Sequence, residues 1–83
     1  MAYYIEIYKI IEDADMAEYD FKGSGPNGSI GHGRLRIEKA SGDVTVLECS
    51  ATSLSSKLSE RATWKLMMHW EKKEMPDSTI WAS

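Results

Sequence analysis

Only a few side chains of this sequence could catalyse a reaction or bind a transition metal near neutral pH: His32, His69 and Cys49. No H-E-x-x-H or C-x-x-C motif is present, and no pair of these residues has the spacing of a metal site. A hairpin turn at Ser41-Gly42 would set His32 opposite residues 50–52, close to Cys49. No recognisable pattern supplies that pair with an orienting acid or an oxyanion hole. We therefore expect no catalytic residue, no metal and no cofactor, with His32 exposed, His69 partly buried and Cys49 a small buried hydrophobe.

The segment Gly23–Gly28 matches the glycine pattern G-x-G-x-x-G letter for letter. That pattern binds dinucleotides where it joins a strand to the N-terminus of a helix. Here a strand-like segment follows, and Pro26 lies inside the motif, so residues 23–33 are predicted to be an interstrand loop. An alternative hypothesis is a small-molecule-binding or enzymatic protein with a pocket between sheet and helix near this loop. Its polar groups would be His32, Arg34, Tyr19 and Cys49.

Five acidic residues gather over nine positions of the first predicted hairpin: Glu12, Asp13, Asp15, Glu18 and Asp20. They lack the ligand spacing and central glycine of a calcium loop. The cluster indicates a solvated hairpin or, alternatively, an acidic docking surface for a basic partner.

Two arginines, Arg34 and Arg36, project from one face of the third predicted strand. We expect them to pair across strands with carboxylates such as Glu18, Asp20 or Glu48. A second alternative is weak nucleic-acid binding through the two arginines. The net charge of −3 argues against nucleic acid, because such binding depends on neutralising phosphates.

The helix predicted over residues 54–74 carries two apolar features. Its main stripe comprises Leu58, Ala62, Leu66 and Trp70, with Met67 on the flank. At about 100° per residue, Trp64 and Met68 lie roughly 240° and 280° from Leu58, on the polar face, and they are neighbours on the helix surface. A Trp–Met pair among charged residues is typical of a protein interface. The alternative is that the tail residues Ile80 and Trp81 fold over the pair.

Hydrophobic periodicity predicts the elements that position these residues. Alternating apolar residues indicate strands over 3–11, 16–22, 34–38 and 44–49, joined as two hairpins. In the first strand Tyr3, Ile5, Ile7 and Ile11 share one parity. Gly42 suits a left-handed turn position, and Pro76 ends the helix. The prediction is a single α+β domain over residues 1–83: a four-stranded antiparallel sheet (about 2–50), a C-terminal helix and an extended tail (75–83).

Length and composition limit the class of protein. The 83 residues allow one small core, and 42% hydrophobic content is enough to fold it. No apolar run is long enough to span a membrane, and no signal peptide is recognisable. A lone cysteine in so small a chain favours a reducing compartment, so we expect a cytoplasmic protein with no membrane contact.

In size, acidity and element order the chain resembles small bacterial or phage accessory proteins, such as the immunity proteins of toxin–immunity systems. This resemblance implies inhibition by surface occlusion. We therefore expect a non-enzymatic module that binds a protein partner or a second copy of itself. Its expected contacts are Trp64 and Met68, with the five acids of the first hairpin.

Overall fold

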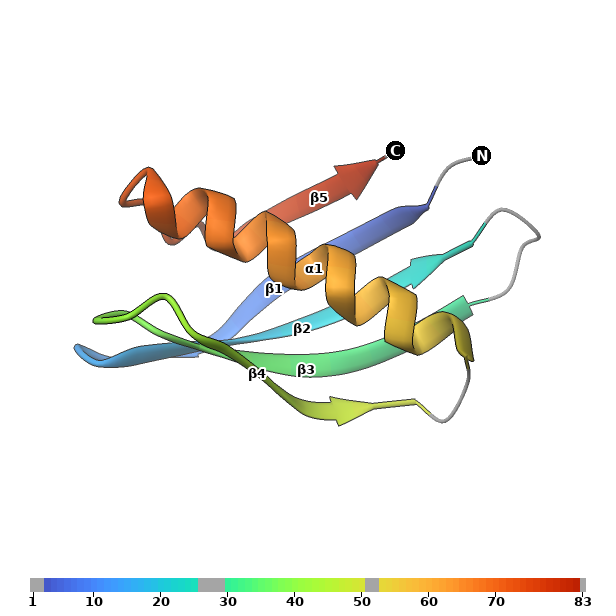
Figure 1. Cartoon of the computed structure of the whole chain (residues 1–83), viewed down its shortest axis with the longest axis horizontal. Helices are drawn as coiled ribbons and strands as arrows, with labels where there is room; N and C mark the ends of the chain where they lie inside the picture. The colour runs from blue at the N-terminus through green and yellow to red at the C-terminus, as the bar shows by residue number, and fades with distance from the viewer. Residues whose placement is uncertain (1–2, 26–29, 51–52, 83) are drawn as a thin grey trace.

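The computed structural model describes residues 3–25, 30–50 and 53–82. Its elements in chain order are β1 (Tyr4–Glu12), β2 (Met16–Ser24), β3 (Ile30–Glu38), β4 (Val44–Cys49), α1 (Ser53–Glu71) and β5 (Ser78–Ala82). The five strands form one antiparallel sheet in the order β4-β3-β2-β1-β5 (Figure 1). The predicted α+β class, with its four-stranded meander and one helix, is confirmed.

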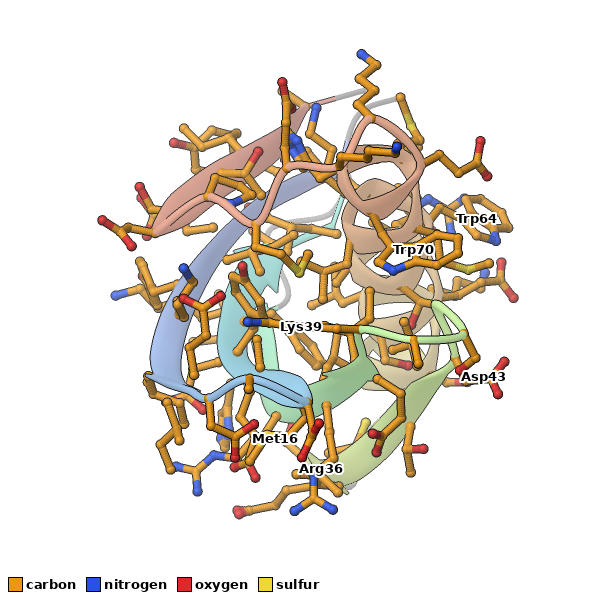
Figure 2. The ribbon with its side chains drawn as sticks, turned by 90° about the vertical axis from the view of Figure 1, so that its left-hand side faces the viewer. Met16, Arg36, Lys39, Asp43, Trp64 and Trp70 are labelled. Atoms are coloured by element: carbon orange, nitrogen blue, oxygen red, sulfur yellow. The ribbon has the colours of Figure 1, made fainter. Side chains whose placement is uncertain are left out.

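The helix α1 covers one face of the sheet, which curves around it (Figure 2). Because strand residues alternate between faces, every second residue of β1, β2 and β3 points to the helix. The buried core comprises Ile5, Ile7, Ala17, Tyr19, Phe21, Leu35, Ile37, Leu58, Ala62 and Leu66. The alternating apolar residues that predicted β2 and β3 are therefore core residues. The predicted main stripe of the helix also packs there, with Trp70 partly buried against the core. We call the other sheet face, which no helix of the described residues covers, the open face.

The parity predicted for β1 holds for Ile5 and Ile7 but is wrong for Ile11, which is half exposed. The register with β2 shifts between Lys9 and Ile11, so Ile10 is an extra residue. Such a bulge reverses the faces of the residues beyond it. Ile11 consequently lies opposite Glu18, whose side chain belongs to the open face.

The predicted extended tail contributes a fifth strand to the sheet, β5. β5 pairs with β1, from Tyr8↔Ser78 to Tyr4↔Ala82, and this makes β1 an interior strand. Trp81 faces the core, whereas Ile80 pairs with Glu6 and is exposed on the open face. The helix is therefore followed by a strand.

The helix ends at Glu71, three residues before the predicted end at 74. Lys73 has a left-handed backbone, with φ of 61°. The N–H of Glu74 donates to the C=O of His69 (2.8 Å), and the N–H of Lys73 to that of Trp70 (2.9 Å). This pair of bonds is the Schellman motif, which satisfies the last carbonyls of a helix. The chain leaves the helix there, before Pro76 is reached.

The predicted glycine-rich loop is shorter than expected, because most of it belongs to strands. Gly23 pairs with Gly31 within β2 and β3, and residues 26–29 of the predicted loop lie outside the described part. A Cβ at Gly23 would clash with the carbonyl oxygen of Tyr4, and one at Gly33 would come within 2.6 Å of the Phe21 ring. These glycines allow close packing between strands. At the β3–β4 turn, Gly42 has the predicted positive φ, 78°.

Candidate binding surface

The outside of α1 carries an exposed apolar surface. Trp64 and Met68 are 46% and 47% exposed, and Met67 is exposed beside them. Ala62 and Leu66 point into the core, and the helical repeat then turns residues 64 and 68 away from the sheet. Figure 2 shows Trp64 on the side of the helix away from the sheet. We call Trp64, Met67 and Met68 the outer helix surface.

Trp64 contacts neighbouring side chains although almost half of it is exposed. Its ring lies 6.1 Å from that of Trp81, centroid to centroid, with 53° between the ring planes. The guanidinium carbon of Arg61 lies 4.2 Å from the ring centroid of Tyr3 and 5.8 Å from that of Trp64, within the range of cation–π attraction. The tail thus orients Trp64 through Trp81 without covering it. Ile80 belongs to the opposite sheet face, so the predicted apolar lid of Ile80 and Trp81 does not form.

Met67 was predicted on the flank of the buried stripe, but it is exposed. Its neighbour Trp70 lies against the β3–β4 turn, where its Nε1–H donates to the carbonyl of Lys39 at 2.7 Å. Met67, three residues before Trp70, lies next to it on the side of the helix near β4. On that edge strand Val46 and Leu47 are also exposed, 46% and 41%. The exposure of Val46 and Leu47 could not be predicted from the sequence, because β4 has the alternation of a covered strand. These side chains are exposed because β4 lies at the edge of the sheet.

The acids at the tip of the β1–β2 hairpin have local structural roles. Asp13 Oδ1 accepts hydrogen bonds from the N–H groups of Asp15 and Met16, and these bonds lower its pKa. Glu12 is bound by Lys39 and Lys9, each at 2.7 Å, and these partners lower the pKa of its carboxyl to about 2. Asp15 is exposed at the turn.

Glu18 and Asp20 lie on the open face and pair with the two arginines, as predicted. Arg36 Nη2 lies 2.9 Å from Glu18 Oε2, and Arg34 Nε lies 2.9 Å from Asp20 Oδ1. Their carboxylates therefore already neutralise the arginines. The open face and the outer helix surface lie on opposite sides of the sheet–helix layers, so the structure does not bring Glu18 and Asp20 together with Trp64 and Met68.

The four residues of the alternative pocket do not meet. His32 and Arg34 lie on the open face; the backbone of His32 pairs with Ser50, within the predicted range. Tyr19 is fully buried on the helix side, and its hydroxyl donates to the carbonyl of Pro76 at 2.7 Å. Burial raises the pKa of Tyr19 to about 12. Core side chains fill the space between sheet and helix.

The prediction that Cys49 is buried is wrong: its side chain is exposed. It pairs with Gly33, at the end of β4 and on the face opposite to His32, so the two do not form a dyad. Cys49 is exposed because β4 is an edge strand with no neighbour beyond it in the described sheet. His69 is partly buried, as predicted, and its ring nitrogens contact Glu74 Oε1 and Thr79 Oγ1, each at 3.0 Å. It joins the end of α1 to β5.

Two hollows lie on the open face, and another, of about 410 Å³, lies between the end of α1 and Lys39. One of about 430 Å³ is lined by Tyr4, Glu6, Lys22, Ile30 and His32, with glycines beneath. A second, of about 300 Å³, shares Lys22 and His32 with it and reaches Arg34. His32 and Arg34 thus lie beside hollows, but on the face opposite to the predicted one.

No protein-family model matches the chain, and no curated protein or solved structure shows significant similarity to it. Among the described residues, no three His, Cys, Asp or Glu side chains gather so as to hold a metal ion. The described helix is not of a length and hydrophobicity that would cross a membrane.

Proposed function

We propose that this protein is a non-enzymatic protein-binding module that acts by covering a surface of its partner. The observation that carries the proposal is the half-exposed Trp64, held from one side by Trp81 and adjoining the exposed Met68. Tryptophan is enriched among residues that dominate binding energy, and methionine adapts to irregular partner surfaces. Orienting the indole before binding lowers the entropic cost of association.

The charges around the outer helix surface support the same proposal. Glu60 and Glu71 are exposed one turn before and after Trp64 and Met68, and Lys57 follows the same flank. An apolar centre within a charged rim is the usual anatomy of a non-obligate interface. The rim excludes water from the anchor and contributes little energy itself.

The proposed mechanism is occlusion, as in an inhibitor or immunity protein: Trp64 enters a pocket of the partner and the helix covers the surrounding surface. The acids of the β1–β2 hairpin contribute less to binding in this proposal than the sequence predicted. Since Glu12, Glu18 and Asp20 are paired with cations of this chain, they add little to the field that would attract a basic partner. The helix provides the affinity in this proposal.

The test is co-purification from the native host with the double variant Trp64→Ser plus Met68→Ser. A matched control, Ile10→Ser plus Ile30→Ser, removes two exposed apolar side chains elsewhere. We expect the helix variant to lose a stoichiometric protein partner that the wild type and the control retain, with all three chains folded by circular dichroism. If both variants recover the partner equally, the proposal that the helix binds it is contradicted.

A second candidate, small-molecule binding, is favoured by the hollow of about 430 Å³ on the open face. Its wall combines the Tyr4 ring and the His32 imidazole with the ammonium of Lys22, which Glu6 approaches at 4.0 Å, and this suits a flat molecule carrying a polar group. Screening aromatic carboxylates by NMR would test it: shifts confined to Tyr4, Lys22 and His32 support it, and no shift at high ligand concentration contradicts it.

A further inference from the structure

We propose that β4 pairs antiparallel with β4 of a second copy of this chain, so that two sheets join into one across a two-fold axis at Thr45. In the sheet, β4 has β3 on one side and no described strand on the other (Figure 1). A strand in this position presents unpaired N–H and C=O groups that can template another strand. This inference is independent of the partner proposed for Trp64 and Met68.

The register of β4 shows which backbone groups are available. The N–H of Glu38 donates to the C=O of Asp43 at 2.9 Å. Two residues along, Arg36 and Thr45 are opposite each other and continue the hydrogen-bonded pairs. Val44 and Val46 alternate with them, opposite Ile37 and Leu35, so their N–H and C=O groups point away from β3.

The residues of this edge that precede the register shift carry no charge or proline that would oppose pairing. Natural edge strands often carry lysine or proline, whereas Val44-Thr45-Val46-Leu47 carries no charge and no proline. Val46 and Leu47 are 46% and 41% exposed. The register shift that makes Leu47 an extra residue limits the available edge to the segment before it.

This edge is complementary to itself, which identifies a second copy as the occupant. With Thr45 on the axis, Val44 of each copy lies opposite Val46 of the other, and both can exchange N–H···O=C bonds. Thr45 then faces Thr45, a favourable cross-strand pair. No residue of like charge faces itself at the axis. The second copy would also approach the apolar flank of α1 beside β4, where Val46 and Met67 are exposed.

The test is sedimentation equilibrium of the full chain and two edge variants. Val46→Pro removes an outward N–H, which an edge strand tolerates, and replaces a side chain that is half exposed. Thr45→Glu keeps the backbone, places a carboxylate next to Arg36 within the chain, and sets two carboxylates opposite each other at the axis. We expect a concentration-dependent dimer whose dissociation constant rises about ten- to a hundredfold in each variant. Ala82→Glu, on the other edge strand, is the matched control and should leave the dissociation constant of the dimer unchanged.

Cysteine cross-linking tests the register directly, in a Cys49→Ser background. Residues opposite each other in a non-hydrogen-bonded pair lie at a Cα separation that a disulfide can bridge. Thr45→Cys should therefore form a covalent dimer under mild oxidation, and Ala82→Cys should not. The proposal is overturned if the wild type is monomeric at all concentrations, or if its dimer survives both edge variants unchanged. A dimer abolished only by Trp64→Ser plus Met68→Ser also overturns it.

Discussion

Trp64 and Leu66 show how two neighbouring apolar residues of one helix take different roles. Leu66 is fully buried and belongs to the core, whereas Trp64 is 46% exposed, with Trp81 and Arg61 beside its ring. A core side chain contributes to the stability of the fold through its burial and through the packing around it. A half-exposed one leaves much of its apolar area available for a partner.

These two residues should therefore differ in their effect on stability. Leu66→Ala is expected to lower the free energy of unfolding by about 2–5 kcal/mol, because it leaves a cavity in the core. Trp64→Ala should cost about 1–2 kcal/mol, the worth of its ring and cation–π contacts. Urea denaturation of both variants measures the difference. A larger loss for Trp64→Ala than for Leu66→Ala would mean that Trp64 is a structural residue.

Glu12 gives the fold a dependence on acid pH. Lys39 and Lys9 lower the pKa of its carboxyl from 4.5 to about 2 in the folded chain. A lowered folded-state pKa stabilises the fold above the unfolded pKa and loses that contribution as the pH falls through the folded one. The share of stability due to Glu12 should therefore be full above pH 4.5 and disappear towards pH 2.

Urea denaturation across this pH range should show a smaller loss of stability on acidification for Glu12→Gln than for the wild type. Lys39→Met should behave similarly, because it removes the main partner of the carboxylate. Combining the two changes should add little to either alone. Wild-type dependence on pH in Glu12→Gln would contradict the assigned ion pairs.

At the scale of elements, the end of α1 is determined by one residue in an unfavourable conformation. Lys73 occupies the left-handed position of the Schellman motif, where glycine is usual. The left-handed region costs a non-glycine residue about 1–2 kcal/mol, partly offset by the flexibility that glycine adds to the unfolded chain.

Lys73→Gly is therefore expected to stabilise the protein by about 0.5–1 kcal/mol, seen as a higher melting temperature in a calorimeter. Lys72→Gly, one residue earlier, is the matched control. Its φ is not positive, so glycine there should destabilise the fold by up to about 1 kcal/mol. A lower melting temperature for Lys73→Gly would contradict the capping role.

Periodicity predicted the faces of the elements well, but it could not predict events that depend on neighbouring strands. The core-facing residues of β2 and β3 can be predicted from the alternation of apolar residues, because α1 covers one face of each strand. The bulge at Ile10 and the extra residue Leu47 depend on pairing with another strand, which local pattern does not contain. For the same reason Gly23 and Gly33 resembled a loop, although close approach between strands requires them there.

At the scale of the whole molecule, the residues that were predicted to form one binding surface lie on opposite sides. Trp64 and Met68 were predicted from helical spacing, and their exposure agrees with it. Glu18 and Asp20 lie beyond the sheet, on the open face, so one small contact cannot include all four residues. Sequence alone could not separate them, because their faces are known only once the sheet is assembled with the helix on one side.

The central claim, that the outer helix surface binds another protein, is tested most directly by photo-cross-linking from position 68. A photoreactive methionine analogue would replace Met68, and the same group at Ile30, which is 77% exposed on the open face, serves as the control. In extract of the native host, we predict one defined heteromeric product from position 68 and none from position 30. No product from position 68, or the same products from both positions, would contradict the account.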